Sequence, residues 1–139
     1  MNMIKQLVHD PIFLAMKSAP ATQADISVAR DLLDTLIAHR DSCVGMAANM
    51  IGICKRIIVF QDSGMFFTMM NPEITAKSGA YDAEEGCLSL LGGPRPVRRF
   101  HRITVKYQGL DMKWHTGNYE GWTAQIIQHE VDHCNGVLI

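Results

Sequence analysis

Two histidines set four residues apart near the end of the chain constrain the fold more than any other feature of this sequence. They are His129 and His133, in the pattern His-Glu-x-x-His. In an α-helix such residues lie one turn apart on one face, so both imidazole rings can reach the same metal ion. The opposite face carries Ile127 and Val131, which favours a helix packed against a core over a surface helix that holds the motif by chance. We therefore predict a helix from about Trp122 to Cys134 whose histidine face points inward.

The metal site that this motif predicts needs a third protein ligand and one open coordination position. Only residues 134–139 follow His133, and Cys134 lies about 100° further round the helix, so it cannot face the same ion. The third ligand must then come from upstream. Cys87 is the strongest candidate, because Gly86 before it permits a close backbone approach and a thiolate completes a set suited to zinc or ferrous iron. The other upstream cysteines and histidines are better explained as small buried side chains or surface residues.

The motif also contains a base. Glu130 follows the first histidine, where its carboxylate can take a proton from metal-bound water. A structural metal site needs no base and is normally closed by four ligands. The sequence therefore predicts a catalytic ion, and the alternative of a different class is a non-enzymatic protein whose metal serves folding or sensing.

Apolar periodicity predicts one more helix and several strands. Residues Thr22 to Arg40 begin with a Thr-x-x-Asp start signal and continue with apolar residues at helical spacing, so we expect a helix there. Strand patterns occur at Arg56–Gln61, Phe66–Met70, Glu73–Lys77, Arg102–Tyr107 and Asp111–Thr116. Asn71-Pro72 is expected to end the second strand, and Gln108-Gly109 to turn a hairpin between the last two. Helix, strands and helix in this order predict an α+β fold with mostly antiparallel sheet.

The composition limits the class of function. The 139 residues suit a single domain over 1–139, and 47% apolar with 19% charged residues is a globular balance. A net charge of −1 gives no overall attraction to nucleic acid or to an anionic membrane, and no apolar run is long enough to cross a bilayer. The first ten residues do not resemble a signal peptide, so the cysteines are expected to be thiols or ligands and the protein to be cytoplasmic.

Three motifs in the same chain order resemble those of the peptide deformylase family. Glu85-Gly86-Cys87-Leu88-Ser89 matches its E-G-C-L-S motif, and Gln128-His129-Glu130-Val131-Asp132-His133 matches its Q-H-E-x-D-H motif. Gly45-Met46-Ala47-Ala48-Asn49-Met50 matches most of its G-x-G-x-A-A-x-Q motif. The resemblance covers essentially the whole chain. It implies mostly antiparallel sheets packed around a central helix that bears H-E-x-x-H, and a hydrolase that removes the formyl group from the N-terminal formylmethionine of newly made proteins.

The resemblance also implies a catalytic centre. Cys87, His129 and His133 would bind one divalent ion, with ferrous iron expected first and zinc or nickel able to take its place. Glu130 would act as general acid and base on a metal-activated water. The backbone N–H of Leu88 would help to hold the oxyanion.

Further residues are expected around that centre. The resemblance implies substrate contacts at Gly45, Met50, Glu85 and Gln125. The Gly45 strand would align the substrate by backbone hydrogen bonds. An ion pair between Arg99 and Asp132 would help to orient the metal ligands. The expected partners are N-formylmethionyl peptides of nascent chains, near the ribosome, with no membrane and no nucleic-acid sequence recognition.

The sequence departs from the family pattern at two positions. Cys43 replaces the first glycine of the G-x-G motif, which is a mild change. Met50 replaces the final glutamine, whose amide donates a hydrogen bond to the developing oxyanion, and a thioether has no such donor. Losing one donor of this kind costs about 10²–10³ in rate, and the amide of Asn49 next door is one methylene shorter. The alternative function is therefore a deformylase-like paralogue with weak or altered activity on N-acyl substrates.

Overall fold

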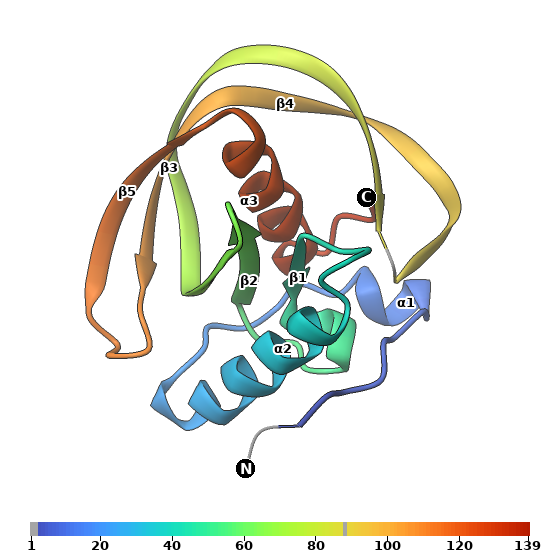
Figure 1. Cartoon of the computed structure of the whole chain (residues 1–139), viewed down its shortest axis with the longest axis vertical. Coiled ribbons are helices and arrows are strands. Elements are labelled where there is room, and N and C mark those ends of the chain that lie inside the picture. The colour runs from blue at the N-terminus through green and yellow to red at the C-terminus, as the bar shows by residue number, and fades with distance from the viewer. Residues whose placement is uncertain (1–2, 88) are drawn as a thin grey trace.

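The computed structural model describes residues 3–87 and 89–139, which form a five-stranded antiparallel sheet with helices packed on it (Figure 1). The strands follow chain order across the sheet, so each pairs with the next along the sequence. They are β1 (Gly45–Ala47), β2 (Ile57–Asp62), β3 (Met65–Cys87), β4 (Leu90–Gln108) and β5 (Trp114–Glu120). The helices are α1 (Pro11–Leu14), α2 (Ile26–Ala38) and α3 (Gly121–Cys134), with 3₁₀ turns η1 (Gln23–Asp25) and η2 (Ala48–Ile51). The predicted α+β class is confirmed.

The long strands β3 and β4 form an arch over α3 (Figure 1). The expectation that Asn71-Pro72 ends a strand is wrong, because β3 continues through both residues for a total of 23. Asn71 adopts a φ of 52°, and the register between β3 and β4 shifts between Met70 and Glu73. The turn signal is thus absorbed as a bulge in a paired strand, and the separate strand expected at Glu73–Lys77 is part of β3.

The other predicted elements are present with shifted ends. Helix α3 begins one residue before the predicted start, and Gly136 beyond its end has the positive φ of 76° typical of a helix stop. The helix expected from Thr22 divides into η1 and α2, with the Thr22 N–H donating to Asp25 at 2.8 Å. The expected hairpin is the antiparallel pair of β4 and β5. The sequence patterns did not indicate α1, whose first N–H groups are capped by Asp10.

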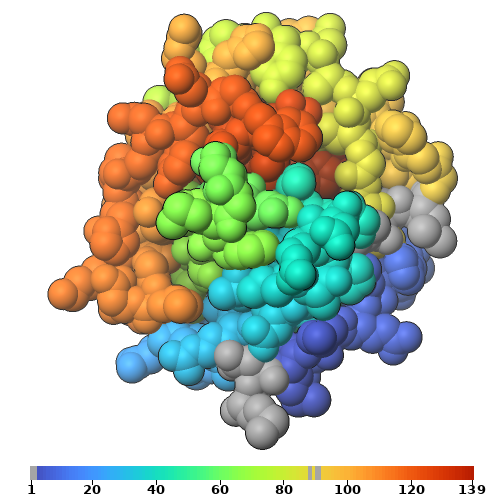
Figure 2. Space-filling view, viewed as in Figure 1, coloured from blue at the N-terminus to red at the C-terminus, as the bar shows by residue number. Residues whose placement is uncertain are grey.

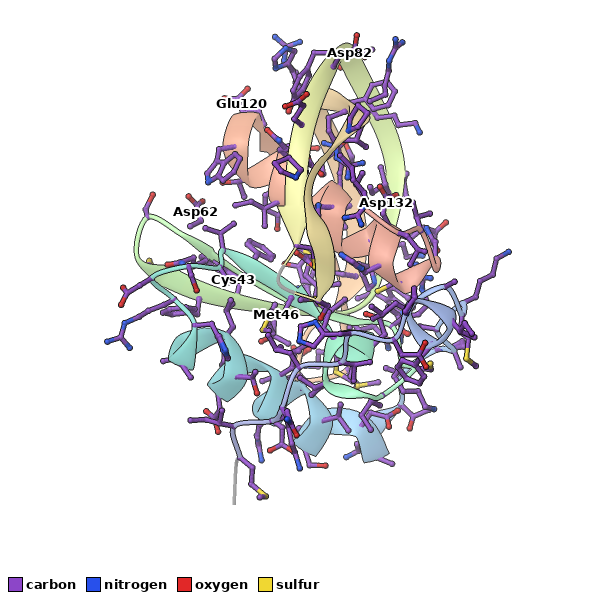
Figure 3. All side chains as sticks on the ribbon, turned by 90° about the vertical axis from the view of Figure 1, so that its right-hand side faces the viewer. Cys43, Met46, Asp62, Asp82, Glu120 and Asp132 are labelled. Carbon is purple, nitrogen blue, oxygen red and sulfur yellow. The ribbon has the colours of Figure 1, made fainter. Side chains whose placement is uncertain are left out.

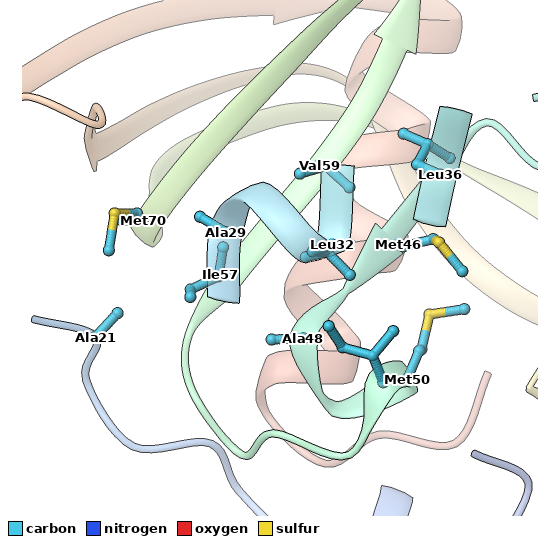
Figure 4. Close-up of a cluster of buried hydrophobic side chains, with 11 residues drawn as sticks. Ala21, Ala29, Leu32, Leu36, Met46, Ala48, Met50, Ile57, Val59 and Met70 are labelled. Atoms are coloured by element: carbon cyan, nitrogen blue, oxygen red, sulfur yellow. The ribbon is translucent and has the colours of Figure 1, made fainter. Parts of the chain in front are cut away.

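Strand β2 is buried on both faces because it lies between α2 and α3. Ile57 and Val59 point into a cluster formed with Leu32 and Leu36 of α2 (Figure 4). Ile58 and Phe60 alternate with them and point into a second cluster with Ile127 and Val131 of α3. The second cluster holds the apolar face of α3 against the sheet, and the histidine face is thereby turned toward the end of β3.

Two expectations from composition can be compared with the structure. The four cysteines are free thiols, as expected for a chain without a disulfide framework. Among the described residues, no helix has both the length and the apolar character needed to cross a membrane.

Candidate metal centre

The inner face of α3 brings His129 and His133 together beneath the β3–β4 arch. Their Nε2 atoms lie 3.1 Å apart, so the two rings are aimed at one point. Cys87, the last residue of β3, supplies a third ligand atom, and the sulfur and one ring nitrogen from each histidine all lie within 4.8 Å of one another. The three side chains predicted as metal ligands are therefore neighbours.

This donor set fits a divalent metal. One thiolate with two imidazoles is a combination typical of zinc and ferrous iron. Two ring nitrogens that face each other at 3.1 Å can both direct a lone pair at a shared cation. Burial lowers the pKa of His133 to about 3, which keeps its ring neutral, and the neutral imidazole is the form that binds metal.

Glu85 fixes the orientation of His129. Its Oε1 lies 2.8 Å from Nδ1 of His129, on the side of the ring away from Nε2. Arg99 donates to Glu85 through Nη2 at 2.7 Å and Nε at 3.0 Å, and the Gln125 amide donates to Glu85 Oε2 at 2.9 Å. Burial opposes ionisation of Glu85, but the hydrogen bonds from His129, Arg99 and Gln125 lower its pKa to about 2. The carboxylate therefore stays charged and accepts hydrogen bonds from all three groups.

The predicted ion pair between Arg99 and Asp132 is also present. Nη1 of Arg99 lies 2.6 Å from Oδ2 of Asp132, which Figure 3 labels on α3. Arg99 is 3% exposed, although a cluster of arginines on a strand would ordinarily be solvated. Its guanidinium thus ties β4 both to α3 and, through Glu85, to the end of β3.

Glu130 is buried beside the ligands and keeps an oxygen without a partner. Its side chain is 4% exposed, and Oε1 has no hydrogen-bond partner among the described residues. Burial raises the pKa of Glu130 to about 7, a value suited to a group that takes and returns a proton near neutral pH. Gly45 leaves the space that this carboxylate occupies, since a Cβ at Gly45 would lie 2.9 Å from Oε2 of Glu130.

Asn49 and Met50, at the last two positions of the G-x-G-x-A-A-x-Q motif, both have buried side chains. Asn49 is fully buried and its amide donates to the backbone carbonyl of His133 at 3.0 Å, which ties η2 to the end of α3. Met50 is 1% exposed in the apolar cluster under α2, with Met46 beside it in Figure 4. Its sulfur accepts the Ala47 N–H at 3.4 Å. The Asn49 amide is thus hydrogen-bonded to α3. Contact of Met50 with substrate stays a prediction.

A cavity of about 440 Å³ opens beside Cys87 and His129. Its walls come from residues 42–45, from residues 84–87 and from the face of α3 with Trp122, Gln125, Ile126, His129 and Glu130. Figure 2 shows the surface hollowed where these cyan, yellow-green and orange-red segments meet. Strand β1 stands at the end of the sheet order and, among the described residues, pairs with β2. Its three residues are buried, and Gly45 lines the cavity.

The predicted site residues are divided between this cavity, the core and the undescribed part of the chain. Lining the cavity are Gly45, Glu85, Cys87, Gln125, His129 and Glu130. The predicted role of the Leu88 N–H falls outside the described residues. Glu85 and Gln125 were expected to contact substrate, but their polar atoms are hydrogen-bonded to each other and to His129, Arg99 and Tyr81. Contact of either side chain with substrate stays a prediction.

Sequence reasoning missed several lining residues. Trp122 and Ile126 stand on the same face of α3 as His129, at spacings of seven and three residues, and helical periodicity could have found them. Cys43, labelled in Figure 3, lines the cavity and donates its thiol proton to the Gly45 carbonyl at 3.0 Å. Burial raises the pKa of Cys43 to about 12, so this group remains a thiol.

Comparison with known proteins agrees with this geometry. The family model described as Polypeptide deformylase matches residues 3–139. The peptide deformylase of Clostridium beijerinckii is 47% identical over 137 residues, which cover 99% of this chain and 100% of that protein. That of Dictyoglomus thermophilum is 39% identical over 142 residues, covering 99% and 91%.

Solved structures give the same result. The crystal structure of peptide deformylase from Thermotoga maritima is 31% identical with a TM-score of 0.87, over 99% of this chain and 95% of that chain. A Met-Ala-Ser-bound class I type b peptide deformylase from Acinetobacter baumannii is 29% identical with a TM-score of 0.87, over 99% and 97%. With the family model matching nearly every residue, this chain belongs to the peptide deformylase family.

Proposed function

We propose that this protein removes the formyl group from the N-terminal formylmethionine of newly made proteins. The observation that carries the proposal is the cluster of Cys87, His129 and His133 beside a buried Glu130 with an unpartnered oxygen. A metal that serves only folding would have four ligands and no use for such a base. Membership of the peptide deformylase family supplies the substrate class.

A few side chains have separate roles in the hydrolysis: they bind the metal, transfer the proton and orient a ligand. Cys87, His129 and His133 would hold one divalent ion, which when bound acidifies water and polarises the formyl carbonyl. Glu130 accepts the water proton on its buried carboxylate and returns it to the leaving amine, so that formate and a free α-amino group are produced. Glu85 accepts a hydrogen bond from Nδ1 of His129 and thereby keeps Nε2 available as a ligand.

The substrate is proposed to bind as an added strand. Strand β1 lies at the end of the sheet, and Gly45 would offer its backbone groups to an extended peptide on the side of the cavity. The adjoining cavity of about 440 Å³ would receive the methionine side chain. The Acinetobacter relative binds Met-Ala-Ser, a peptide of the class that deformylation would release. The Leu88 N–H is proposed as the donor to the oxyanion.

Three finer assignments accompany this proposal. Ferrous iron is proposed as the resident ion, with zinc or nickel able to occupy the same mixed nitrogen and sulfur ligands. The proposed place of action is the cytoplasm near the ribosome, where formylated chains emerge. Residues 1–139 are proposed to act as a single catalytic domain, because α2 and α3 pack on opposite faces of one strand, β2.

A second candidate is an N-acyl hydrolase of altered specificity, which the replacement of the usual glutamine by Met50 favours. The two can be separated by assaying iron-loaded protein anaerobically on formyl-Met-Ala-Ser and on acetyl-Met-Ala-Ser. We expect release of formate and no release of acetate. Release of acetate without formate would support the second candidate, and release of neither would contradict both.

A further inference from the structure

Gln125 lies between two groups that fix the direction of its side-chain amide. Its Nε2 donates to Oε2 of Glu85 at 2.9 Å, and its Oε1 accepts a hydrogen bond from the Tyr81 hydroxyl at 3.0 Å. The side chains of Tyr81, Gln125, Glu85 and His129 therefore form one continuous chain of hydrogen bonds that ends on a proposed metal ligand.

The hydrogen bonds at the two ends of the Gln125 amide agree on one orientation of that amide. An amide offers a carbonyl oxygen on one side and an NH₂ group on the other. With the Tyr81 hydroxyl donating to the carbonyl, the NH₂ group faces the Glu85 carboxylate. An amide turned the other way would place its oxygen against a charged carboxylate oxygen, and the amide oxygen would have no donor there. The carboxylate of Glu85, which only accepts, thus fixes the amide orientation, and the Tyr81 hydroxyl supports it by donating to the amide oxygen.

Gln125 is a third group that donates to the Glu85 carboxylate, after Arg99 and His129. Arg99 approaches both carboxylate oxygens from one side, and His129 approaches Oε1. Among the described residues, Gln125 is the group of α3 that donates to Oε2, and α3 also carries His129. Removing it takes away one of the contacts that hold the carboxylate against the His129 ring.

The backbone places Tyr81 where it can do this without touching the ligands. Tyr81 and Arg99 are cross-strand partners in the β3–β4 arch, next to Asp82, which Figure 3 labels at the crest. The Tyr81 ring stacks on His101 with centroids 4.1 Å apart, which holds the hydroxyl toward Gln125. Stacking on His101 fixes the position of the Tyr81 ring, and the Tyr81 hydroxyl donates a hydrogen bond to the Gln125 amide.

We propose that Tyr81 and Gln125 are positioning residues that orient His129 through Glu85. The role of this chain in deformylation rests on the proposed function, but its effect on metal retention does not. Removing the neutral hydrogen bond from Tyr81 to Gln125 is expected to change metal release by about 2- to 12-fold. The bond from Gln125 to the charged Glu85 carboxylate is of the stronger kind, so its removal should have at least that effect. Tyr81 acts through Gln125, so removing both groups should cost no more than removing the Gln125 amide alone.

The test uses Co²⁺ as the probe metal in the full chain. Tyr81→Phe keeps the ring and its stack on His101 but removes the hydroxyl, and Gln125→Met keeps the length of the side chain but removes the amide. Tyr107→Phe is the matched control, because Tyr107 stacks on His115 and its hydroxyl pairs with Tyr119, away from this chain. For each protein, the rate of Co²⁺ loss to excess chelator and the visible absorption of bound Co²⁺ are measured.

We expect Tyr81→Phe and Gln125→Met each to release Co²⁺ faster and to alter its absorption bands, with Tyr107→Phe unchanged. The double variant should match Gln125→Met. Wild-type release from Gln125→Met would overturn the proposal, as would effects of the two substitutions that multiply in the double variant. If Tyr81→Phe does not fold, Gln125→Met decides the result alone.

Formate release from formyl-Met-Ala-Ser is measured on the same proteins. We expect kcat to fall in both variants. In Tyr81→Phe we expect KM to stay unchanged, because the described residues that line the cavity include Gln125 but not Tyr81. Faster Co²⁺ release in variants of a protein that releases no formate would support the positioning chain and contradict the proposed function. Formate release by the wild-type protein together with unaltered Co²⁺ release in Gln125→Met would support the proposed function and contradict the positioning chain.

Discussion

Replacing Gly45 by alanine should disturb the base without removing any functional group. An added Cβ would lie 2.9 Å from Oε2 of Glu130 and 2.9 Å from Cγ2 of Ile126. Ordinary contacts begin near 3.5 Å, so strand and helix must separate by about 0.6 Å. Neither side yields easily, because Glu130 and Ile126 are each 4% exposed and Gly45 is paired with Phe60 of β2.

The expected loss follows from that displacement. Overpacking of this kind costs about 1–3 kcal/mol, which at about 4 °C per kcal/mol for a chain of this size lowers Tm by about 4–12 °C. A catalytic group misplaced by about 1 Å costs about 10² in rate, so a shift of about half that size should lower kcat by about 10-fold or more. Circular dichroism gives Tm, and formate release at saturating metal gives kcat.

The chain offers a matched control for the stability measurement. A Cβ added at Gly86 would meet no protein atom within 4 Å, so Gly86→Ala should change the free energy of unfolding by less than about 0.5 kcal/mol. A Gly45→Ala variant with the Tm and kcat of the wild type would refute the argument that Gly45 is required for the close approach of β1 to Glu130.

Three further substitutions test individual roles. Glu130→Gln should keep the metal but lose about 10²–10⁴ of the hydrolysis rate, because an amide cannot accept the water proton; metal analysis and kcat check this, and retained turnover would contradict it. Arg99→Ala should weaken metal binding by about 10–100-fold with the three ligands intact, measured as Co²⁺ affinity, and unchanged affinity would count against its orienting role. Met50→Gln should raise kcat by up to about 10² if the new amide reaches the oxyanion, at constant metal identity, and an unchanged kcat in the folded variant would mean that another donor already serves.

Much of the fold could be predicted because its signals are local. The spacing of His129 and His133 within an apolar helix pattern predicted α3 and the face it turns inward. The alternating strand residues predicted β2, the part of β4 that pairs with β5, and the hairpin between those two strands. These patterns depend on side chains a few residues apart, which helix and strand geometry relate directly.

The length of β3 could not be predicted, because it depends on pairing between distant residues. Asn71-Pro72 is a strong local stop signal, yet the ladder from Glu73 to Cys87 with β4 outweighs it and leaves only a bulge. The same long register places Arg99 beside Glu85, and neither residue's neighbours in sequence reveal this contact.

The site could be predicted in residue type more than in side-chain direction. A motif identifies Glu85, Met50 and Asn49, but it does not say which way each one points. The structure has Glu85 bound to His129, Asn49 bound to the carbonyl of His133, and Met50 in the core. Gln125 and its partner Tyr81 come together across 44 residues of sequence, a contact that only the fold provides.

The most direct test of the account compares formate release with metal content in one preparation. The iron-loaded protein is assayed anaerobically on formyl-Met-Ala-Ser, stripped with a chelator, assayed again, and then titrated with ferrous ion. We predict that formate release falls to background on stripping and returns in proportion to bound metal, reaching its plateau at about one ion per chain, the single ion that one set of three protein ligands holds. Undiminished formate release from the metal-free protein, or none from the fully loaded protein, would contradict it.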